Sequence, residues 1–145
     1  MSAYVLDASV AAKWFLPQTE ETLVEESLEV LDSYAKGRTT LLVPDLFWPE
    51  FGNVLWKAVR SGRMSKESAE EAVLTITSQK LPTASSLPLL SDAFGIAVSF
   101  QRTVYDSIYV ALAIASGRAL LTADERLANA LAAYFPIRWL GSATA

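Results

Sequence analysis

The sequence contains no cysteine and no histidine among its 145 residues. Without cysteine, the chain has neither disulfides nor thiolate metal sites. Without histidine, it has no imidazole base, which excludes Ser-His-Asp and Cys-His catalysis together with typical zinc-hydrolase sites. Any catalytic chemistry must therefore come from carboxylates, hydroxyls, amides, amines or a bound ion.

Long apolar runs are also missing. Hydrophobic residues make up 52% of the chain, yet no run approaches the roughly 20 residues that cross a bilayer. The N-terminus lacks the basic and then apolar segments of a secretory signal. We therefore expect a soluble, cytoplasmic protein with one domain over residues 1–145, a common single-domain length.

The net charge of −4 comes from 12 basic and 16 acidic residues, which at face value disfavours an anionic partner such as nucleic acid. If four acids form a metal-binding cluster, however, 12 acids remain against 12 bases. Bound cations would then make the cluster attractive to phosphate. The charge objection to a nucleic-acid substrate is therefore weak.

Short apolar runs alternate with longer segments of helical period, which predicts an α/β fold. Pro82 suits a strand at a sheet edge, because proline cannot donate to a ladder, and the polar stretch 83–86 is expected to be a loop. The expected strands are Tyr4–Leu6, Leu41–Val43, Leu81–Thr83, Ala119–Leu121 and Ile137–Trp139. The expected helices are Ala8–Leu16, Glu21–Ala35, Leu46–Ser61, Ser65–Ser78, Ser91–Phe100, Tyr105–Ser116 and Asp124–Ala133.

Four acids lie where expected strands give way to helices or where a helix begins. Asp7, Glu50 and Asp124 follow three of the strands, and Asp106 opens the helix that starts at Tyr105. In a parallel sheet, these junctions and helix N-termini share the carboxyl edge. We therefore expect the four carboxylates to converge, and convergent carboxylates repel one another unless a cation neutralises them. Oxygen ligands favour Mg²⁺ or Mn²⁺.

A structural alternative stays open for each acid. Asp7 and Asp124 are suitable helix N-caps, and Thr103 with Asp106 resembles a capping box. Glu50 complements a helix dipole.

Three polar residues near the acids are candidate supports. Asn53 lies three residues after Glu50, Ser9 lies two after Asp7, and Thr122 precedes the fourth acid by two. Each side chain is placed to hydrogen-bond a ligand carboxylate. Helix-surface solvation for the amide, and local turn or cap bonds for the hydroxyls, are the alternatives.

Four segments of the chain carry a resemblance to a known family. They are Tyr4–Val10, Pro49–Leu55, Tyr105–Ala113 and Leu121–Leu127. In this order and at these intervals they resemble the PIN domain, and within it the VapC-type toxin ribonucleases of VapBC toxin–antitoxin systems. The resemblance implies a three-layer α/β/α sandwich with a five-stranded parallel sheet. It also implies Mg²⁺- or Mn²⁺-dependent endoribonuclease activity, a VapB-type antitoxin that covers the site, and a homodimer.

The resemblance assigns the metal-ligand and catalytic roles to Asp7, Glu50, Asp106 and Asp124, with Glu125 as a secondary candidate. Four carboxylates are compatible with one ion or two. Lys13 is the first candidate for substrate binding, since it lies about one to two helical turns beyond Asp7. Ordinary solvated surface charge is the alternative for Lys13 and for the other nearby bases, Lys57, Arg60, Arg63 and Arg102.

Two other classes of function remain open. One is an aspartyl-phosphate receiver or phosphatase-like domain, which also gathers acids and Mg²⁺ at the carboxyl edge of a sheet. Asp7-Ala8-Ser9 lacks the second acid of the phosphatase Asp-x-Asp motif, and no lysine follows the late strands as in a receiver. The other class is a noncatalytic RNA- or protein-binding scaffold in which the acids only cap helices.

Overall fold

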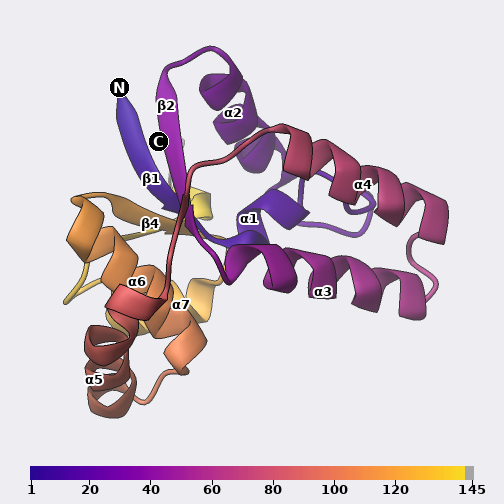
Figure 1. Cartoon of the computed structure of the whole chain (residues 1–145). Helices are drawn as coiled ribbons and strands as arrows, with labels where there is room; N and C mark the ends of the chain where they lie inside the picture. Colours follow the sequence, from indigo (N-terminus) through magenta and orange to yellow (C-terminus); the bar gives the residue numbers. More distant parts are fainter. Residues whose placement is uncertain (143–145) are drawn as a thin grey trace.

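The structure, a computed structural model, describes residues 1–142, so residues 143–145 of the expected domain lie outside the described residues (Figure 1). Its elements are β1 (Ser2–Leu6), α1 (Ala8–Ala12), α2 (Val24–Ala35), β2 (Thr39–Pro44), α3 (Phe47–Arg60), α4 (Lys66–Ser78), β3 (Thr83–Ala84), η1 (Leu87–Leu89), α5 (Leu90–Phe100), α6 (Val104–Ser116), β4 (Ala119–Thr122), α7 (Glu125–Leu131), β5 (Ile137–Trp139) and η2 (Leu140–Ser142). In the described range, no helix is both long and apolar enough to cross a membrane.

The five strands form one parallel sheet in the order β3-β2-β1-β4-β5. Within it, Tyr4 of β1 lies opposite Leu41 on one side and Ala119 on the other. The chain builds outward from β1 through β2 to β3 and then crosses back to β4. The carboxyl ends of β1 and β4 therefore flank a topological switch point, where open α/β sheets form their ligand-binding crevice.

Alternate residues of β1 face two separate cores. Tyr4 and Leu6 pack with residues of α1, α2, α3 and α4, whereas Val5 packs with residues of α5, α6 and α7. This alternation is the normal consequence of the two-residue period of a strand. Helices thus cover both faces of the sheet, which confirms the expected three-layer α/β/α sandwich. Figure 1 shows α3 and α4 running side by side away from the sheet.

Three predicted elements differ from the observed ones by more than two residues at an end or in their placement. The second helix begins at Val24 and not at Glu21, because Leu23 before it has a left-handed backbone conformation. The first helix ends at Ala12 and not at Leu16, because the chain turns before Pro17. At the sheet edge, the prediction of a strand over 81–83 and a loop over 83–86 was wrong, since β3 is Thr83–Ala84. Pro82 lacks an N–H, so its only ladder contribution is the carbonyl that accepts from the Val43 N–H at 3.0 Å. The expected edge position of this strand is confirmed.

Candidate metal centre at the carboxyl edge

Asp7 follows β1 directly, and its side chain bonds to neighbours on β4 and α1 without capping α1. Its Oδ2 accepts hydrogen bonds from Ser9 Oγ at 2.9 Å and from Thr122 Oγ1 at 2.6 Å. Ser9 Oγ in turn accepts from the backbone N–H of Ala123 at 3.1 Å. The capping alternative is therefore wrong for Asp7, whose carboxylate ties the carboxyl ends of β1 and β4 together.

Asp124 does cap a helix. Its Oδ1 accepts from the backbone N–H of Leu127 at 3.1 Å, in the first turn of α7. Its own N–H donates to Thr122 Oγ1 at 3.0 Å, so the hydroxyl that binds Asp7 also fixes the turn into α7. The capping interpretation is confirmed for this residue. Capping uses one carboxylate oxygen, and in residues 1–142 the other accepts no hydrogen bond.

Asp106 lies in the first turn of α6, half-buried, where Thr103 caps the helix by accepting from the Asp106 N–H at 3.0 Å. The Asp106 carboxylate forms an ion pair with Arg102, whose Nη2 lies 3.4 Å from Oδ2. The Nε of Arg102 is buried and has no hydrogen-bond partner among the described residues. Arg102 thus already forms an ion pair with Asp106, but its guanidinium does not use all of its N–H donors in the described residues.

Glu50 lies in the first turn of α3, behind Pro49, as expected. Its Oε1 is buried without a hydrogen-bond partner in the described part of the chain, and so is the hydroxyl of Tyr109. The two groups face each other closely enough for each to affect the pKa of the other, but not with the geometry of a hydrogen bond. Asn53 is exposed, and no hydrogen bond within 1–142 links it to Glu50.

Burial raises the pKa of three of the four acids. Desolvation is the main cause for Asp7, for Asp106 and for Glu50, whose pKa rises to about 7. The hydrogen bonds from Thr122 and Ser9 offset part of the rise for Asp7. Like charge adds to it: Asp106 raises the pKa of Asp7, both raise that of Glu50, and Asp124 raises that of Asp106. The carboxylates therefore lie within electrostatic range of one another.

The four acids do not, however, form a closed ligand set. Within residues 1–142, no three acidic side chains lie close enough together to hold one ion. Mutual repulsion favours such separation as long as no cation balances the charge. The donor chemistry nevertheless fits a hard divalent ion, because every candidate ligand is an oxygen and the buried Oε1 of Glu50 lacks a partner.

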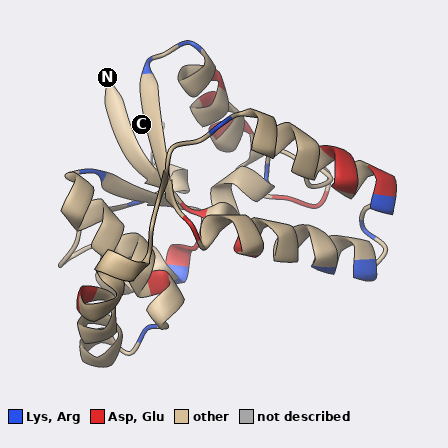
Figure 2. Cartoon of the chain, viewed as in Figure 1, with Lys and Arg blue, Asp and Glu red and all other residues tan. Residues whose placement is uncertain are grey.

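The basic residues are less available than the sequence suggested. Lys13 is 8% exposed, and its ammonium pairs with Glu21 at 3.1 Å. Arg63 pairs with the same Glu21 and with Glu20. Figure 2 shows acidic residues around the N-terminal ends of α3, α6 and α7, and basic residues scattered over the chain, with a group of them where α3 ends and α4 begins. A substrate-binding role for Lys13 stays a prediction.

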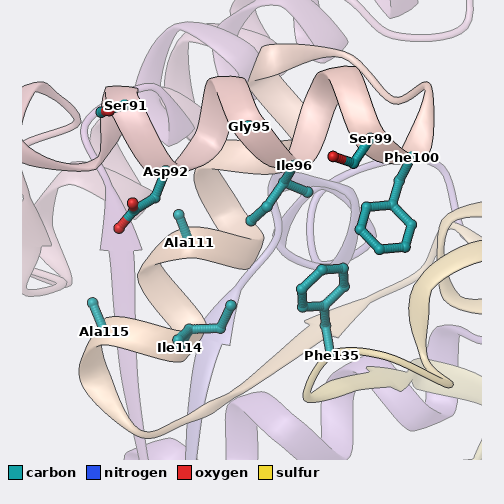
Figure 3. Close-up of a pocket in the computed structure, with 10 residues that line it drawn as sticks. All are labelled: Ser91, Asp92, Gly95, Ile96, Ser99, Phe100, Ala111, Ile114, Ala115 and Phe135. Atoms are coloured by element: carbon teal, nitrogen blue, oxygen red, sulfur yellow. The ribbon is translucent and has the colours of Figure 1, made fainter.

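A groove of about 510 Å³ lies elsewhere, between α5 and α6 (Figure 3). Its walls are mostly apolar, with Phe100 and Phe135 in edge-to-face contact at 5.0 Å between ring centroids. Asp92 is the one charged residue that lines it, and none of the four acids does. This groove therefore offers no cation for a phosphate and is separate from the candidate metal centre.

Sequence reasoning missed two contacts at the site. It did not identify Tyr109, and it named Arg102 only as a substrate candidate without its ion pair to Asp106. Tyr109 lies on α6 three residues after Asp106, a spacing that brings side chains together on a helix, and Arg102 lies four residues before Asp106, just ahead of the Thr103 cap. That spacing is the signal that would have found them.

The chain is similar in sequence and in fold to a set of known proteins. A family model described as PIN domain matches residues 4–131. A Pyrobaculum aerophilum protein named Ribonuclease VapC3 is 35% identical over 127 residues, covering 86% of this chain and 92% of that protein. Exonuclease VapC9 of the same organism is 32% identical over 96 residues, covering 66% of this chain and 71% of that protein. A toxin-antitoxin complex from Klebsiella pneumoniae shares the fold alone, with a TM-score of 0.61 and 12% identity over 94% of this chain and 97% of that one.

Proposed function

Because the chain belongs to the PIN-domain family, alongside VapC ribonucleases, we propose that it is a Mg²⁺- or Mn²⁺-dependent endoribonuclease. The substrate would be cytoplasmic RNA, and the chain would act as the toxin of a toxin–antitoxin pair, with residues 1–145 forming a single nuclease domain. One observation carries the proposal. Partly buried carboxylates lie around the switch point of the sheet within electrostatic range of one another, and the buried Oε1 of Glu50 has no hydrogen-bond partner among the described residues.

Asp7, Glu50, Asp106 and Asp124 would hold the ion. When bound, Mg²⁺ or Mn²⁺ supplies Lewis-acid chemistry, which makes water a better nucleophile and stabilises negative charge on the phosphodiester. No protein nucleophile is required. Ser9 and Thr122 both donate to the same oxygen of Asp7, which fixes its rotamer and preorganises the site.

Arg102 is the cation best placed to contact the scissile phosphate. Its guanidinium lies beside Asp106, and its only hydrogen bond in the described residues is the long one of 3.4 Å to that carboxylate. Neutralisation of Asp106 by an ion would free the guanidinium for phosphate, which arginine binds well. Single-stranded or looped RNA suits such a site better than duplex, because its backbone can be splayed into a cleft.

The partners we propose are an antitoxin and a second copy of the chain. A VapB-type antitoxin would cover the acids; the Klebsiella pneumoniae structure of the same fold is itself a toxin-antitoxin complex. The homodimer is supported by an exposed apolar stripe along η1 and α5. Its residues are Leu87 (77% exposed), Leu90 (50%), Phe94 (58%) and Val98 (65%). Contiguous apolar surface of this kind typically marks an interface.

The receiver-domain alternative is wrong on topology. Receivers have the strand order 2-1-3-4-5, whereas this sheet has the order β3-β2-β1-β4-β5. The noncatalytic scaffold is separated from the nuclease by the experiment below.

The test is cleavage of a circular single-stranded RNA by the purified chain in EDTA, Mg²⁺ or Mn²⁺. An endonuclease opens the circle, whereas an exonuclease finds no end. We expect cleavage only with the ion, and a loss of at least about 100-fold in Asp7→Asn and Asp106→Asn, because each removes a ligand charge.

Asp45→Asn is the matched control. Asp45 also follows a strand at the carboxyl edge, but its Oδ2 accepts from Ser86 N and Oγ at 3.1 and 3.3 Å, a bond an asparagine oxygen can keep. This variant should cleave like the wild type. Equal cleavage in EDTA, or full activity of Asp7→Asn, would refute the proposed function.

A further inference from the structure

The hydroxyl of Tyr109 is a buried polar group close to the candidate metal centre, and the proposed chemistry has not yet given it a role. Tyr109 is 2% exposed, and its hydroxyl oxygen is buried without a hydrogen-bond partner in residues 1–142. Such a group is destabilising, because it loses its bonds to water and gains none in return. An orphaned hydroxyl in a native core therefore needs an explanation.

The position of Tyr109 suggests what that explanation is. It lies on α6, three residues after Asp106, so both side chains leave the helix on the same face. Its hydroxyl lies next to the carboxylate of Glu50 on α3 and to the backbone of Ala8 at the start of α1, within electrostatic range of Asp7 after β1. A single donor from α6 thus reaches the space between two carboxylates from two other elements.

The group that the hydroxyl faces is orphaned as well. Glu50 Oε1 is buried and unpartnered in the described chain, and Asn53 does not supply a bond to it. By contrast, Asp7 is held by Ser9 and Thr122. Of the acids, Glu50 is therefore the one whose carboxylate orientation lacks a support, and a phenol is a suitable donor for it.

We propose that Tyr109 is a positioning residue for the metal centre, whose hydroxyl donates to the Glu50 carboxylate when that carboxylate ligates the ion. This inference rests on the proposed function and adds a residue to it. Ligating carboxylates are commonly oriented by such outer hydrogen bonds. A hydrogen bond between the two orphaned atoms would hold Glu50 toward the site shared with Asp7.

The test variant is Tyr109→Phe, measured for Mn²⁺ binding by electron paramagnetic resonance and for thermal unfolding in EDTA. We expect the dissociation constant for Mn²⁺ to rise about 10- to 100-fold, the usual effect of losing an outer-sphere partner. We also expect the melting temperature in EDTA to stay the same or increase, because the variant removes an unpartnered buried hydroxyl. If Tyr109 had only a structural role, the dissociation constant for Mn²⁺ would stay the same and the melting temperature in EDTA would fall.

Tyr4→Phe is the matched control, since Tyr4 is a buried tyrosine in the other core. It should bind Mn²⁺ like the wild type. A double variant tests whether Tyr109 acts through Glu50. In the Glu50→Gln background, adding Tyr109→Phe should change the dissociation constant for Mn²⁺ by no more than about twofold.

Failure of the inference is distinguishable from failure of the proposed function. If the wild type binds Mn²⁺ and Tyr109→Phe binds it equally well, the inference is refuted and the metal centre stands. A melting temperature that falls in Tyr109→Phe well beyond the change in Tyr4→Phe also refutes it. If the wild type binds no Mn²⁺ and cleaves RNA in EDTA, the proposed function itself is refuted.

Discussion

At the scale of single residues, Glu50 is the acid whose charge depends most on conditions near neutral pH. Burial raises its pKa from 4.5 to about 7, and the carboxylates of Asp7 and Asp106 add to the rise. In the cation-free protein, Glu50 is therefore protonated in a substantial fraction of molecules at neutral pH. A divalent ion would have to compete with that proton.

This competition predicts a pH dependence of stability with a definite sign. The folded protein binds the Glu50 proton more tightly than the unfolded chain does. Protonation of Glu50 therefore contributes fully to the free energy of unfolding below about pH 4.5, and this contribution is lost as the pH rises through about 7. The raised pKa values of Asp7 and Asp106 act in the same direction. In EDTA, the melting temperature should therefore fall by a few degrees between about pH 5 and pH 8, measured by differential scanning fluorimetry.

Adding Mn²⁺ should weaken or reverse this fall, because the ion binds the ionised carboxylates of the folded state. Glu50→Gln in EDTA is the control and should show a shallower fall, since its side chain does not titrate. A melting temperature that rises with pH in EDTA, or an equally steep fall in Glu50→Gln, contradicts the assignment of the effect to this residue.

At the scale of elements, the junction between β4 and α7 serves two purposes. Asp124 caps α7 through Oδ1, while Thr122 at the end of β4 bonds both to Asp7 and to the Asp124 N–H. The structural role of this turn therefore overlaps with its proposed catalytic role. Two substitutions at one position can separate them.

Asp124→Asn should keep the cap and lose the charge, whereas Asp124→Ala should lose both. We expect both variants to lose cleavage activity, by at least about 10-fold. Only Asp124→Ala should lose stability, by about 1 kcal/mol or roughly 2–4 °C in melting temperature. Cleavage of circular RNA and thermal unfolding are the two measurements.

Ser65→Ala provides the control for loss of a helix cap. Ser65 Oγ accepts from the Ser68 N–H at 3.1 Å at the start of α4, in a helix that carries none of the four acids. It should lose similar stability and keep its activity. If Asp124→Asn cleaves like the wild type, Asp124 acts as a cap and not as a ligand.

At the scale of the whole molecule, the proposed dimer depends on the apolar stripe of η1 and α5. Replacing Phe94 and Val98 together by glutamate would place two charges in the interface, where burial is unfavourable. We expect the double variant to sediment as a monomer under conditions in which the wild type sediments as a dimer. Dimer affinity should fall at least about 10-fold.

Leu74→Glu is the control, because Leu74 is 71% exposed on α4, in the other helical layer. It should leave the sedimentation of the chain unchanged. A wild type that sediments as a monomer at high concentration would remove the dimer from the proposal without affecting the candidate metal centre.

Much of this architecture was readable from local patterns. The strands around Tyr4–Leu6, Leu41–Val43, Ala119–Leu121 and Ile137–Trp139 were found because a buried strand is a short apolar run, which needs no knowledge of its neighbours. The expected helix ends at Ala35 and Ser116 are confirmed, and each is followed within two residues by a glycine with positive φ, Gly37 and Gly117, which is a local signal. β3 was misplaced because its extent depends on pairing with β2, which lies elsewhere in the chain.

The amino-acid order alone was sufficient for the α/β layers, the absence of thiol and imidazole chemistry, and the position of four acids at one edge of a sheet. It could not distinguish Asp7 from Asp124, because each acid lies between the end of a strand and the start of a helix. Folding separates their roles: Asp124 caps α7, whereas Asp7 is held by Thr122, 115 residues away in sequence. Only the tertiary structure likewise decides the burial that raises the pKa of Glu50 and the position of the Tyr109 hydroxyl beside it. Desolvation and side-chain pairing depend on which segments pack together, and no local pattern contains that information.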